Sequence, residues 1–225
     1  MSPLFYKLWE NGILQYGIWE TVYMTLLSTV LAYVLGLPLG VLLTVTDKNG
    51  VRPIVWLNKT LSVVVNIFRS IPFIILMVAM LPVAKLIVGT SLGNKAMIVM
   101  LVLAAAPYVA RMVESSLKEV NRGVIEAAQA MGTPSFQIVT KVLIPEAKPS
   151  LIVGAVISTV TILSYSAMAG TIGGGGLGQI AITYGYQRFS DDITWLCVIL
   201  VVIIVQIIQE LGMYFARKTD RRNRQ

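Results

Sequence analysis

Histidine is absent from this sequence, cysteine occurs once, and charged residues make up only 13% of the 225 positions. Without histidine the chain lacks the usual general base near neutral pH and the commonest metal ligand. The single thiol, Cys197, cannot form an intrachain disulfide and lies in an apolar run, where it acts as a small hydrophobe. We therefore expect no catalytic residues, no metal site and no redox chemistry in this chain.

Too few charges are present to cover a soluble protein, in which about 25% of residues are charged. Hydrophobic residues make up 56% of the chain. A membrane-crossing helix needs about 20 predominantly apolar residues, and the candidate segments are residues 21–45, 61–83, 96–111, 151–172 and 194–215. We predict an all-α integral membrane protein with five transmembrane helices in one domain, residues 1–216. The third segment is short and contains Pro107, so a tilted or half-inserted helix stays an alternative there.

Lysine and arginine accumulate on the cytoplasmic side of membrane proteins. With five crossings, one side carries Lys48, Arg52, Lys59, Arg111, Lys118, Arg122, Lys141, Lys148, Arg217, Lys218, Arg221, Arg222 and Arg224. The other side carries only Lys7, Lys85, Lys95 and Arg188. We therefore predict the N-terminus outside and the C-terminus inside, with residues 217–225 as a basic cytoplasmic tail. The first 20 residues lack the pattern of a cleaved signal peptide, and no basic stripe interleaved with aromatics indicates nucleic-acid binding.

One cation, Arg69, lies inside the second apolar segment. At the bilayer centre a charge costs about 2.5 to 3.5 kcal/mol on insertion scales. Either Arg69 lies near the cytoplasmic end and reaches the headgroups, or it lines a gate or substrate pathway. Elsewhere, Gly36 and Gly40 form a GxxxG pair that allows two helices to approach closely. Within the apolar segments we find no aspartate or glutamate well inside the hydrocarbon, and Glu210 lies near the inner end of the fifth.

The longest polar interval, residues 117–148, begins with the signals of a short helix. Its apolar residues recur at near-helical spacing: Val124, Ile125, Ala128 and Met131. Gly132 follows and is suited to the left-handed conformation that ends a helix. We therefore predict a helix that ends at Gly132.

A second short helix follows at once. Thr133 is its predicted N-cap and Pro134 its first residue, where the missing N–H does no harm. The predicted apolar face is formed by Phe136, Val139 and Leu143. Pro145 is expected to end this helix. Such a pair exposes an apolar surface that either a partner protein covers or the headgroup region accepts.

Seven residues of the loop match a known pattern, Glu-Ala-Ala with Gly, Ile and Leu-Pro at fixed spacing: Glu126, Ala127, Ala128, Gly132, Val142, Ile144 and Pro145. Val142 and Ile144 are conservative departures from it. The loop thus resembles the EAA motif of type I permeases in binding-protein-dependent ABC importers. The resemblance implies that the loop, including Met131, Thr133 and Pro134, docks its coupling helix into a groove of a separate ATPase subunit.

The resemblance extends through four further segments: NIFRSIPFIIL, VGTSLG, AAPYVARMVESSL and YSAMAGTIGGGGLGQIA. Together they are similar to the permease of the methionine importer family. That family implies a homodimer in the bacterial inner membrane, two partner subunits that bind ATP and Mg, and an extracytoplasmic methionine-binding lipoprotein. It also implies import of L- and D-methionine, with another small amino acid as the alternative. ATP hydrolysis and every cofactor would then belong to the partner subunits.

The glycine run IGGGGLGQ, residues 172–179, resembles a phosphate-binding loop only superficially. A P-loop needs Lys and then Ser or Thr after its last glycine, whereas Gln179 follows Gly178 here. We expect a flexible or tightly turned outer loop instead.

The fourth apolar segment is the least lipid-like, because small and polar residues recur along one face: Gly154, Ser158, Thr161, Tyr165 and Met168. This set is called the small-residue stripe. We predict that it lines the axis of a dimer, with Ser158, Thr161, Tyr165, Ser166 and Met168 contributing to the pathway or its gate. Packing within one subunit is the alternative.

Two other classes of membrane protein compete with an importer permease. A secondary transporter or channel would couple to ions through intramembrane ionisable residues, and the apparent absence of buried carboxylates disfavours it. A scaffold protein would not support ATP hydrolysis that responds to a binding protein.

Overall fold

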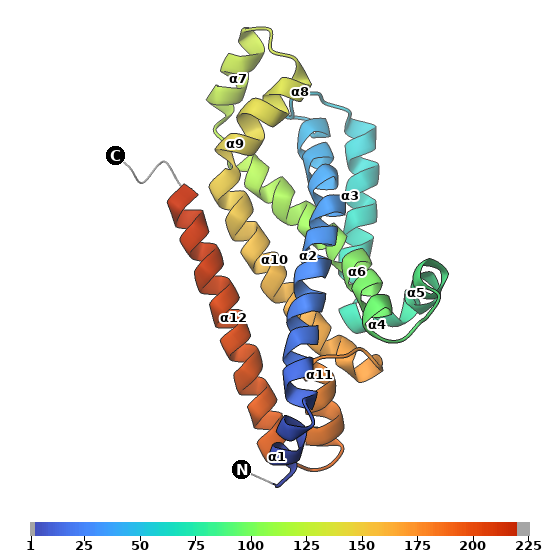
Figure 1. Ribbon diagram of the computed structural model, residues 1–225. Helices are drawn as coiled ribbons and strands as arrows, with labels where there is room; N and C mark the ends of the chain where they lie inside the picture. Colours follow the sequence, from blue (N-terminus) through green and yellow to red (C-terminus); the bar gives the residue numbers. More distant parts are fainter. Residues whose placement is uncertain (1–2, 220–225) are drawn as a thin grey trace. The chain divides into compact units, whose positions relative to one another are not determined.

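The structure is a computed structural model that describes residues 3–219. Every regular element in this part of the chain is a helix, which confirms the predicted all-α class (Figure 1). In chain order the elements are α1 (Pro3–Glu10), α2 (Ile13–Thr46), α3 (Val55–Ser70), α4 (Phe73–Ala79), α5 (Leu81–Val88), α6 (Asn94–Lys118), α7 (Arg122–Ala130), α8 (Ser135–Gln137), η1 (Ile138–Leu143), α9 (Ile144–Glu146), α10 (Lys148–Ala169), η2 (Gly170–Ile172), α11 (Leu177–Ile180), η3 (Ala181–Tyr186) and α12 (Asp191–Thr219).

Four helical stretches are long and apolar enough to cross a membrane: α2, α6, α10 with η2, and α12. A fifth crossing results if α3 and α4, which a short break separates, count as one bent span. The shortest of the four has 25 residues, or about 38 Å at 1.5 Å per residue, against a hydrocarbon core about 30 Å thick. The integral membrane class is therefore confirmed, and the predicted five spans match the higher count.

The interruption expected in the third apolar segment lies in the second instead. α3 ends at Ser70, and the backbone is extended at Ile71 (ψ 127°) and Pro72 (ψ 135°). A residue that precedes proline is disfavoured in the helical region, so Pro72 stops the helix that hydropathy alone joined across residues 61–83. α6, by contrast, continues through Pro107 to Lys118.

α6 and α12 differ in how much of each helix the protein covers. In α6, 67% of the apolar window is buried inside the protein, against 6% for α12. A helix that packs against protein has no need of a long lipid-like surface and accommodates small residues such as Ala104, Ala105 and Ala106. α6 continues through Arg111 and Glu114 to Lys118, and these charged residues are the reason why hydropathy underestimated its length.

The described chain divides into two compact units, and the long helices contribute to both. The first unit comprises residues 3–31, 72–104 and 159–209, and the second comprises residues 32–71, 105–158 and 210–219. The core of the first unit is rich in methionine, with these side chains fully buried: Met24, Met77, Met97 and Met100. Methionine fills irregular gaps because its side chain is unbranched and flexible. In the second unit Leu43, Val65 and Ala110 form a smaller core.

Within the second unit α2 and α6 approach closely at Gly36 and Gly40. A Cβ atom on Gly40 would lie 2.6 Å from the carbonyl oxygen of Ala110 and 2.6 Å from Cβ of Val113. On Gly36 it would lie 2.6 Å from Cγ1 of Val109. The close approach predicted from the GxxxG spacing is confirmed.

Substituting Gly40 tests this contact. Gly40→Ala is expected to lower stability by about 1 to 3 kcal/mol, because the added methyl group meets a backbone oxygen that cannot rotate away. The matched control is Gly154→Ala in α10, where the nearest atoms lie at 3.6 Å or more. There the better helix propensity of alanine should leave stability unchanged or raised. Thermal unfolding of the two variants in detergent measures the difference, and equal midpoints would contradict it.

Candidate functional site

The loop between α6 and α10 begins with α7, which is capped at both ends. The Asn121 side-chain oxygen accepts a backbone N–H two residues further on, at 2.8 Å. At the other end Gly132 has a φ of +73° and donates to the Gln129 carbonyl at 2.9 Å, while Thr133 donates to the Ala128 carbonyl at 3.1 Å. This pair of bonds is a Schellman motif. The predicted helix end at Gly132 is confirmed.

The second helical stretch differs from its prediction at both ends. α8 begins at Ser135 and Pro134 occupies the N-cap position, so Thr133 is not the cap. Pro145 does not end the helix either, because it lies in the first turn of α9 and the helical run continues to Ala147, next to α10. A proline lacks only an N–H that a first turn leaves unused. For that reason it marks a helix start as well as a stop.

The apolar face predicted for this stretch, Phe136, Val139 and Leu143, also differs from what the structure shows. η1 is a π-helix of six residues, whose wider turn places residues five apart on one face. Ile138, Leu143 and Ala147 are accordingly the buried positions, at 1%, 1% and 3% exposure. Val139 is partly buried, but Phe136 is 77% exposed and does not belong to this face. The three residues therefore do not form one exposed face as predicted: Phe136 is exposed, as expected, whereas Leu143 is buried.

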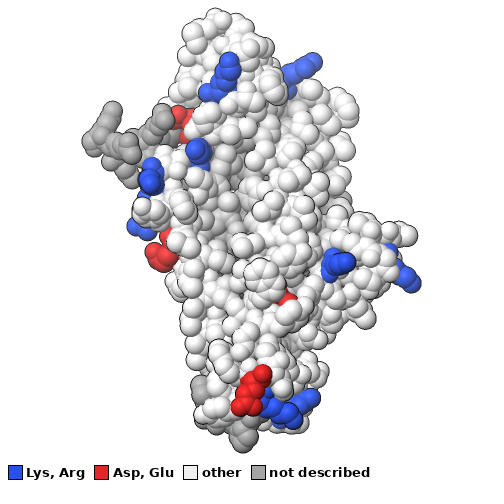
Figure 2. All heavy atoms as spheres, in the orientation of Figure 1, with Lys and Arg blue, Asp and Glu red and all other residues white. Residues whose placement is uncertain are grey.

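The loop exposes an apolar surface with one carboxylate. Met131 and Phe136 are each 77% exposed and Val124 is 45% exposed. Glu126 and Ala127 are exposed beside them, and the Glu126 carboxylate has no partner within residues 3–219. We call these five side chains the docking surface. Lysine and arginine atoms also lie on the part of the molecule that this loop forms (Figure 2).

The remaining motif residues are mostly buried or partly buried. Ala128 is buried, Val142 and Ile144 are partly buried, and Pro145 is exposed. Of the two other residues of the predicted site, Thr133 is partly buried and Pro134 is exposed. The motif therefore combines outward-facing residues with residues that fix the corner and the packing.

A cluster of charges lies in the second unit where α2, α3 and α6 meet. Glu114 is 6% exposed and accepts hydrogen bonds from Arg111 and, at 2.8 Å, from Lys118. Lys118 also donates to Asp47 at 2.7 Å, and Arg111 reaches the Asn66 side-chain oxygen at 3.0 Å. The hydrogen bond from Lys118 holds the pKa of Asp47 below its ordinary value. We call these five residues the charge cluster.

The charge cluster was not predicted from the sequence, because the third span was expected to end at residue 111. α6 runs on to Lys118, so Glu114 is a buried carboxylate on a spanning helix, contrary to the expected absence of such groups. The spacing of Arg111, Glu114 and Lys118, three and four residues apart, places them on one helix face and could have revealed it. Because two cations hold Glu114, the cluster has the character of a structural ion network.

Along α10 the small-residue stripe divides into a buried and a more exposed part. Gly154 and Ser158 are buried, and Ser158 donates to the Gly154 carbonyl at 2.8 Å. Ser166 is also buried, whereas Met168 is 50% exposed. Ile157, Ser164 and Met168 are exposed, and the partly buried Thr161 lies between them at helical spacing; these four residues form the outward face of α10. Thr161 and Met168 are thus the two residues that the predicted stripe shares with this face.

The remaining residues of the predicted pathway are Tyr165 of α10 and Arg69 of α3. In the first unit Tyr165 stacks on Phe73 of α4, with ring centroids 4.1 Å apart and an interplanar angle of 5°. In the second unit Arg69 is exposed, one residue before the end of α3. Of the predicted basic tail, Arg217 and Lys218 lie in the last turn of α12, and the other cations of the tail lie outside the described residues.

The glycine run does not offer a phosphate cradle. Three of its backbone N–H groups are already bonded to side chains of the first unit: Gly175 to Asn94, Gly176 to Glu20 and Leu177 to Thr21. A carboxylate therefore occupies the place a phosphate would need. Within residues 3–219 no group of three or more His, Cys, Asp or Glu side chains could hold a metal ion.

Two proteins of similar sequence carry the same name. The chain is 49% identical over 213 residues to a protein of Vibrio cholerae named as a probable D-methionine transport system permease protein, MetI, which covers 95% of each chain. It is 43% identical over 222 residues to the equivalently named protein of Pasteurella multocida, covering 99% of this chain and all of that one.

Solved structures show the same relationship. A structure described as inward facing conformations of the MetNI methionine ABC transporter matches with a TM-score of 0.93 and 47% identity, covering 98% of this chain and 100% of the other. A family model described as a binding-protein-dependent transport system inner membrane component matches residues 36–225. The chain belongs to this family of inner membrane permease components of ABC transporters.

Proposed function

We propose that this permease imports methionine, both the L and the D form, which an extracytoplasmic binding lipoprotein delivers. The observation that carries the proposal is the 49% identity, along 95% of both chains, to a protein named for D-methionine transport. The match to a methionine transporter of known structure supports it.

The proposed assembly contains two copies of this chain and two ATP-binding subunits. The docking surface supports this arrangement because Met131 and Phe136 are among the most exposed apolar side chains of the second unit. Exposed apolar groups beside an unpaired carboxylate are suited to a protein groove. Hydrolysis of ATP and binding of Mg belong to the partner subunits in this proposal.

The proposed orientation places the N-terminus outside and the loop from α7 to α9 in the cytoplasm, as the charge distribution predicts. α3 then begins at the cytoplasmic side, and Arg69 lies 14 residues further along it than Val55, about 21 Å at 1.5 Å per residue. The cytoplasmic headgroups are then far from the guanidinium, whereas the outer headgroups lie about 9 Å further on in a hydrocarbon core about 30 Å thick. In this proposal water or protein on the substrate pathway, or the outer headgroups, solvate the guanidinium.

Transport in this proposal follows from the movement of a rigid loop. When ATP brings the two ATPases together, the docking surfaces move with them, and each loop moves the end of α10 to which it is joined through α9. Two states of one assembly, inward-facing and outward-facing, are thereby biased by nucleotide at one site and by the binding protein at another.

The outward face of α10 is the proposed lining of the pathway between two copies. Cysteines at Thr161 and Met168 are expected to react with a membrane-permeant thiol reagent at rates that change with bound nucleotide. Cysteines at Ser158 and Ser166, which are buried within one chain, are the matched controls and should react slowly in every state. The native Cys197 is replaced by alanine first. Equal and nucleotide-independent rates at all four positions would remove α10 from the pathway.

Reconstitution tests the function itself. The chain is placed in liposomes with its ATPase and its binding protein, and ATP-dependent uptake of labelled methionine is measured against competing L- and D-amino acids. Uptake that unlabelled methionine of either hand competes away supports the proposal. Uptake that methionine does not reduce would assign another small amino acid, and ATP-independent uptake would assign a secondary transporter.

A further inference from the structure

Glu20 and Asn94 are hydrogen-bonded to each other and hold the glycine loop, residues 173–176, by two further hydrogen bonds in the first unit. The Glu20 carboxylate accepts from the Asn94 side-chain amide and, at 2.8 Å, from the backbone N–H of Gly176. The Asn94 side-chain oxygen accepts from the N–H of Gly175 at 3.1 Å. The three elements α2, α6 and the loop are thus joined by one carboxylate–amide pair, which we call the clamp.

The loop is shaped to fit the clamp. A Cβ atom on Gly175 would meet the Glu20 carboxylate and the Asn94 amide oxygen well inside contact distance. Gly173 and Gly176 have φ values of +86° and +88°, which side chains other than glycine rarely adopt. Because Gly174, Gly175 and Gly176 are buried, their N–H groups need partners within the protein, and the two side chains replace the water that an exposed loop would use.

The clamped loop in turn fixes the end of α10. Gly174 donates to the Ala169 carbonyl at 3.1 Å. Beyond the loop, Gly178 packs against the backbone of Ala167, and Gly170 packs against the backbone of Gln179, so closely that neither position has room for a Cβ atom. Backbone packed on backbone transmits a displacement without side-chain adjustment. A shift of the loop therefore shifts the end of α10, which carries Tyr165 and Met168.

We propose that Glu20 and Asn94 are positioning residues for transport: through the glycine loop they set the place of the α10 end that the pathway uses. The proposal rests on the proposed role of α10. Neither residue belongs to the outward face of α10, the docking surface or the charge cluster. Neither was predicted from the sequence, because the first span was expected to begin at residue 21 and the third at residue 96, which left these two polar residues just outside the expected helices.

Exchanging the two functional groups tests the proposal. In Glu20→Gln an amide faces an amide, so one hydrogen bond is lost and two donors meet. In Asn94→Asp two carboxylates face each other. In the double variant E20Q/N94D the new amide at position 20 donates to the new carboxylate at position 94. Both side chains still accept from the loop N–H groups, so all three hydrogen bonds and the net charge are restored.

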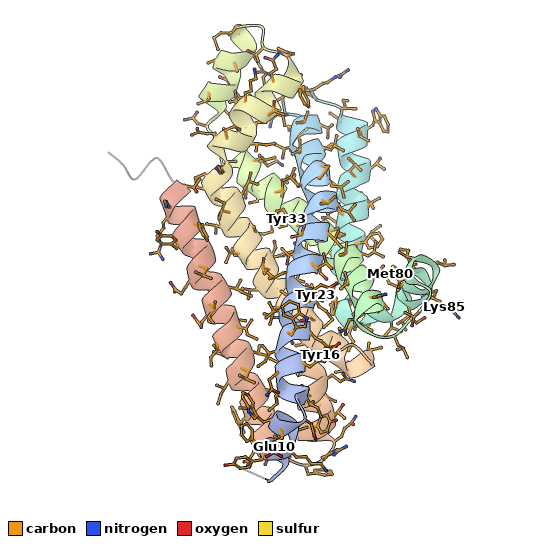
Figure 3. The ribbon with its side chains drawn as sticks, in the orientation of Figure 1. Glu10, Tyr16, Tyr23, Tyr33, Met80 and Lys85 are labelled. Carbon is orange, nitrogen blue, oxygen red and sulfur yellow. The ribbon has the colours of Figure 1, made fainter. Side chains whose placement is uncertain are left out.

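We expect each single variant to lower ATP-dependent uptake at least about tenfold and the double variant to return within about threefold of the original chain. Glu10→Gln, the same substitution at an exposed carboxylate of α1 (Figure 3), is the control and should transport normally. Single variants that transport normally would overturn the proposal. So would a double variant whose loss equals the product of the two single losses.

A second measurement separates the clamp from the transport function. The thiol reaction rate of Met168→Cys is measured in the assembled complex with Cys197 replaced by alanine. Each clamp variant should change this rate at least about threefold, and E20Q/N94D should restore it. If the reconstituted original chain imports no methionine while these rates follow the expected pattern, the proposed substrate fails and the clamp stands. If the rates stay constant in every variant, the clamp does not position α10.

Discussion

Replacing Glu126 by lysine should lower ATP-dependent uptake at least about tenfold without changing the fold. The carboxylate is exposed and makes no hydrogen bond or ion pair with residues 3–219, so nothing within the chain depends on it. A partner that recognises its negative charge would instead meet a like charge, and a repulsive pair in an interface costs several kcal/mol. Loss of transport with intact membrane insertion and an unchanged unfolding midpoint would therefore report a contact with another subunit.

Gly132→Asp tests the same surface through the backbone. A side chain there has open space, since no atom lies within 4 Å of a Cβ at this position, but φ is +73°. For residues other than glycine the left-handed conformation costs about 1 to 2 kcal/mol. We expect the corner between α7 and α8 to open, which separates Met131 from Phe136 and lowers uptake by at least about tenfold while the spanning helices keep their stability.

The matched control for both variants is Glu119→Lys. It reverses the charge of an exposed side chain in the same predicted cytoplasmic loop, seven residues before Glu126 and outside the motif. Its uptake should stay within about twofold of the original. Copurification of the ATPase with each variant gives a direct measure. If Glu126→Lys and Gly132→Asp both transport normally, or if Glu119→Lys is equally impaired, the docking surface is not where the ATPase binds.

Features governed by neighbouring residues were predictable from the sequence. The end of α7 follows from one glycine and the apolar spacing ahead of it, and the structure forms it with two local hydrogen bonds. The close approach at Gly36 and Gly40 follows from their spacing alone. The register of the second short helix was not predictable in this way, because six residues of π-helix shift the buried face and no simple sequence signal marks that geometry.

Contacts between residues far apart in the chain could not be predicted from the sequence. Glu20 and Gly176 are 156 positions apart, and Glu20 and Asn94 are 74 positions apart. The sequence does show that hydrogen-bond partners are needed, because four consecutive glycines carry backbone N–H groups that require partners in a membrane protein. Which side chains meet that need depends on how the helices pack. The charge cluster is intermediate, because three of its residues lie on one face of α6 while Asp47 and Asn66 come from elsewhere.

Glu114→Gln should lower the stability of the folded chain by about 3 kcal/mol, which is the size expected when one partner of a buried ion pair is removed. The Glu114 side chain is 8% exposed, and the Arg111 side chain, which is 21% exposed, is left without its carboxylate partner. The Lys118 contact contributes little, because that side chain is 47% exposed and its interactions are screened by solvent. Thermal unfolding in detergent measures the loss, and Glu210→Gln, at an exposed carboxylate of α12, is the matched control.

A double variant decides whether charge pairing is the cause. Arg111→Met combined with Glu114→Leu removes both charges and keeps the volume, and such replacements are often neutral or stabilising. It should therefore be more stable than Glu114→Leu alone, which leaves Arg111 unpaired. The recovery should be incomplete, because Arg111 also donates to Asn66 on α3 at 3.0 Å and to the Ser62 carbonyl at 3.3 Å. If the double variant is no more stable than Glu114→Leu, the contribution of Glu114 is packing, and the ion pair has no net effect on the fold.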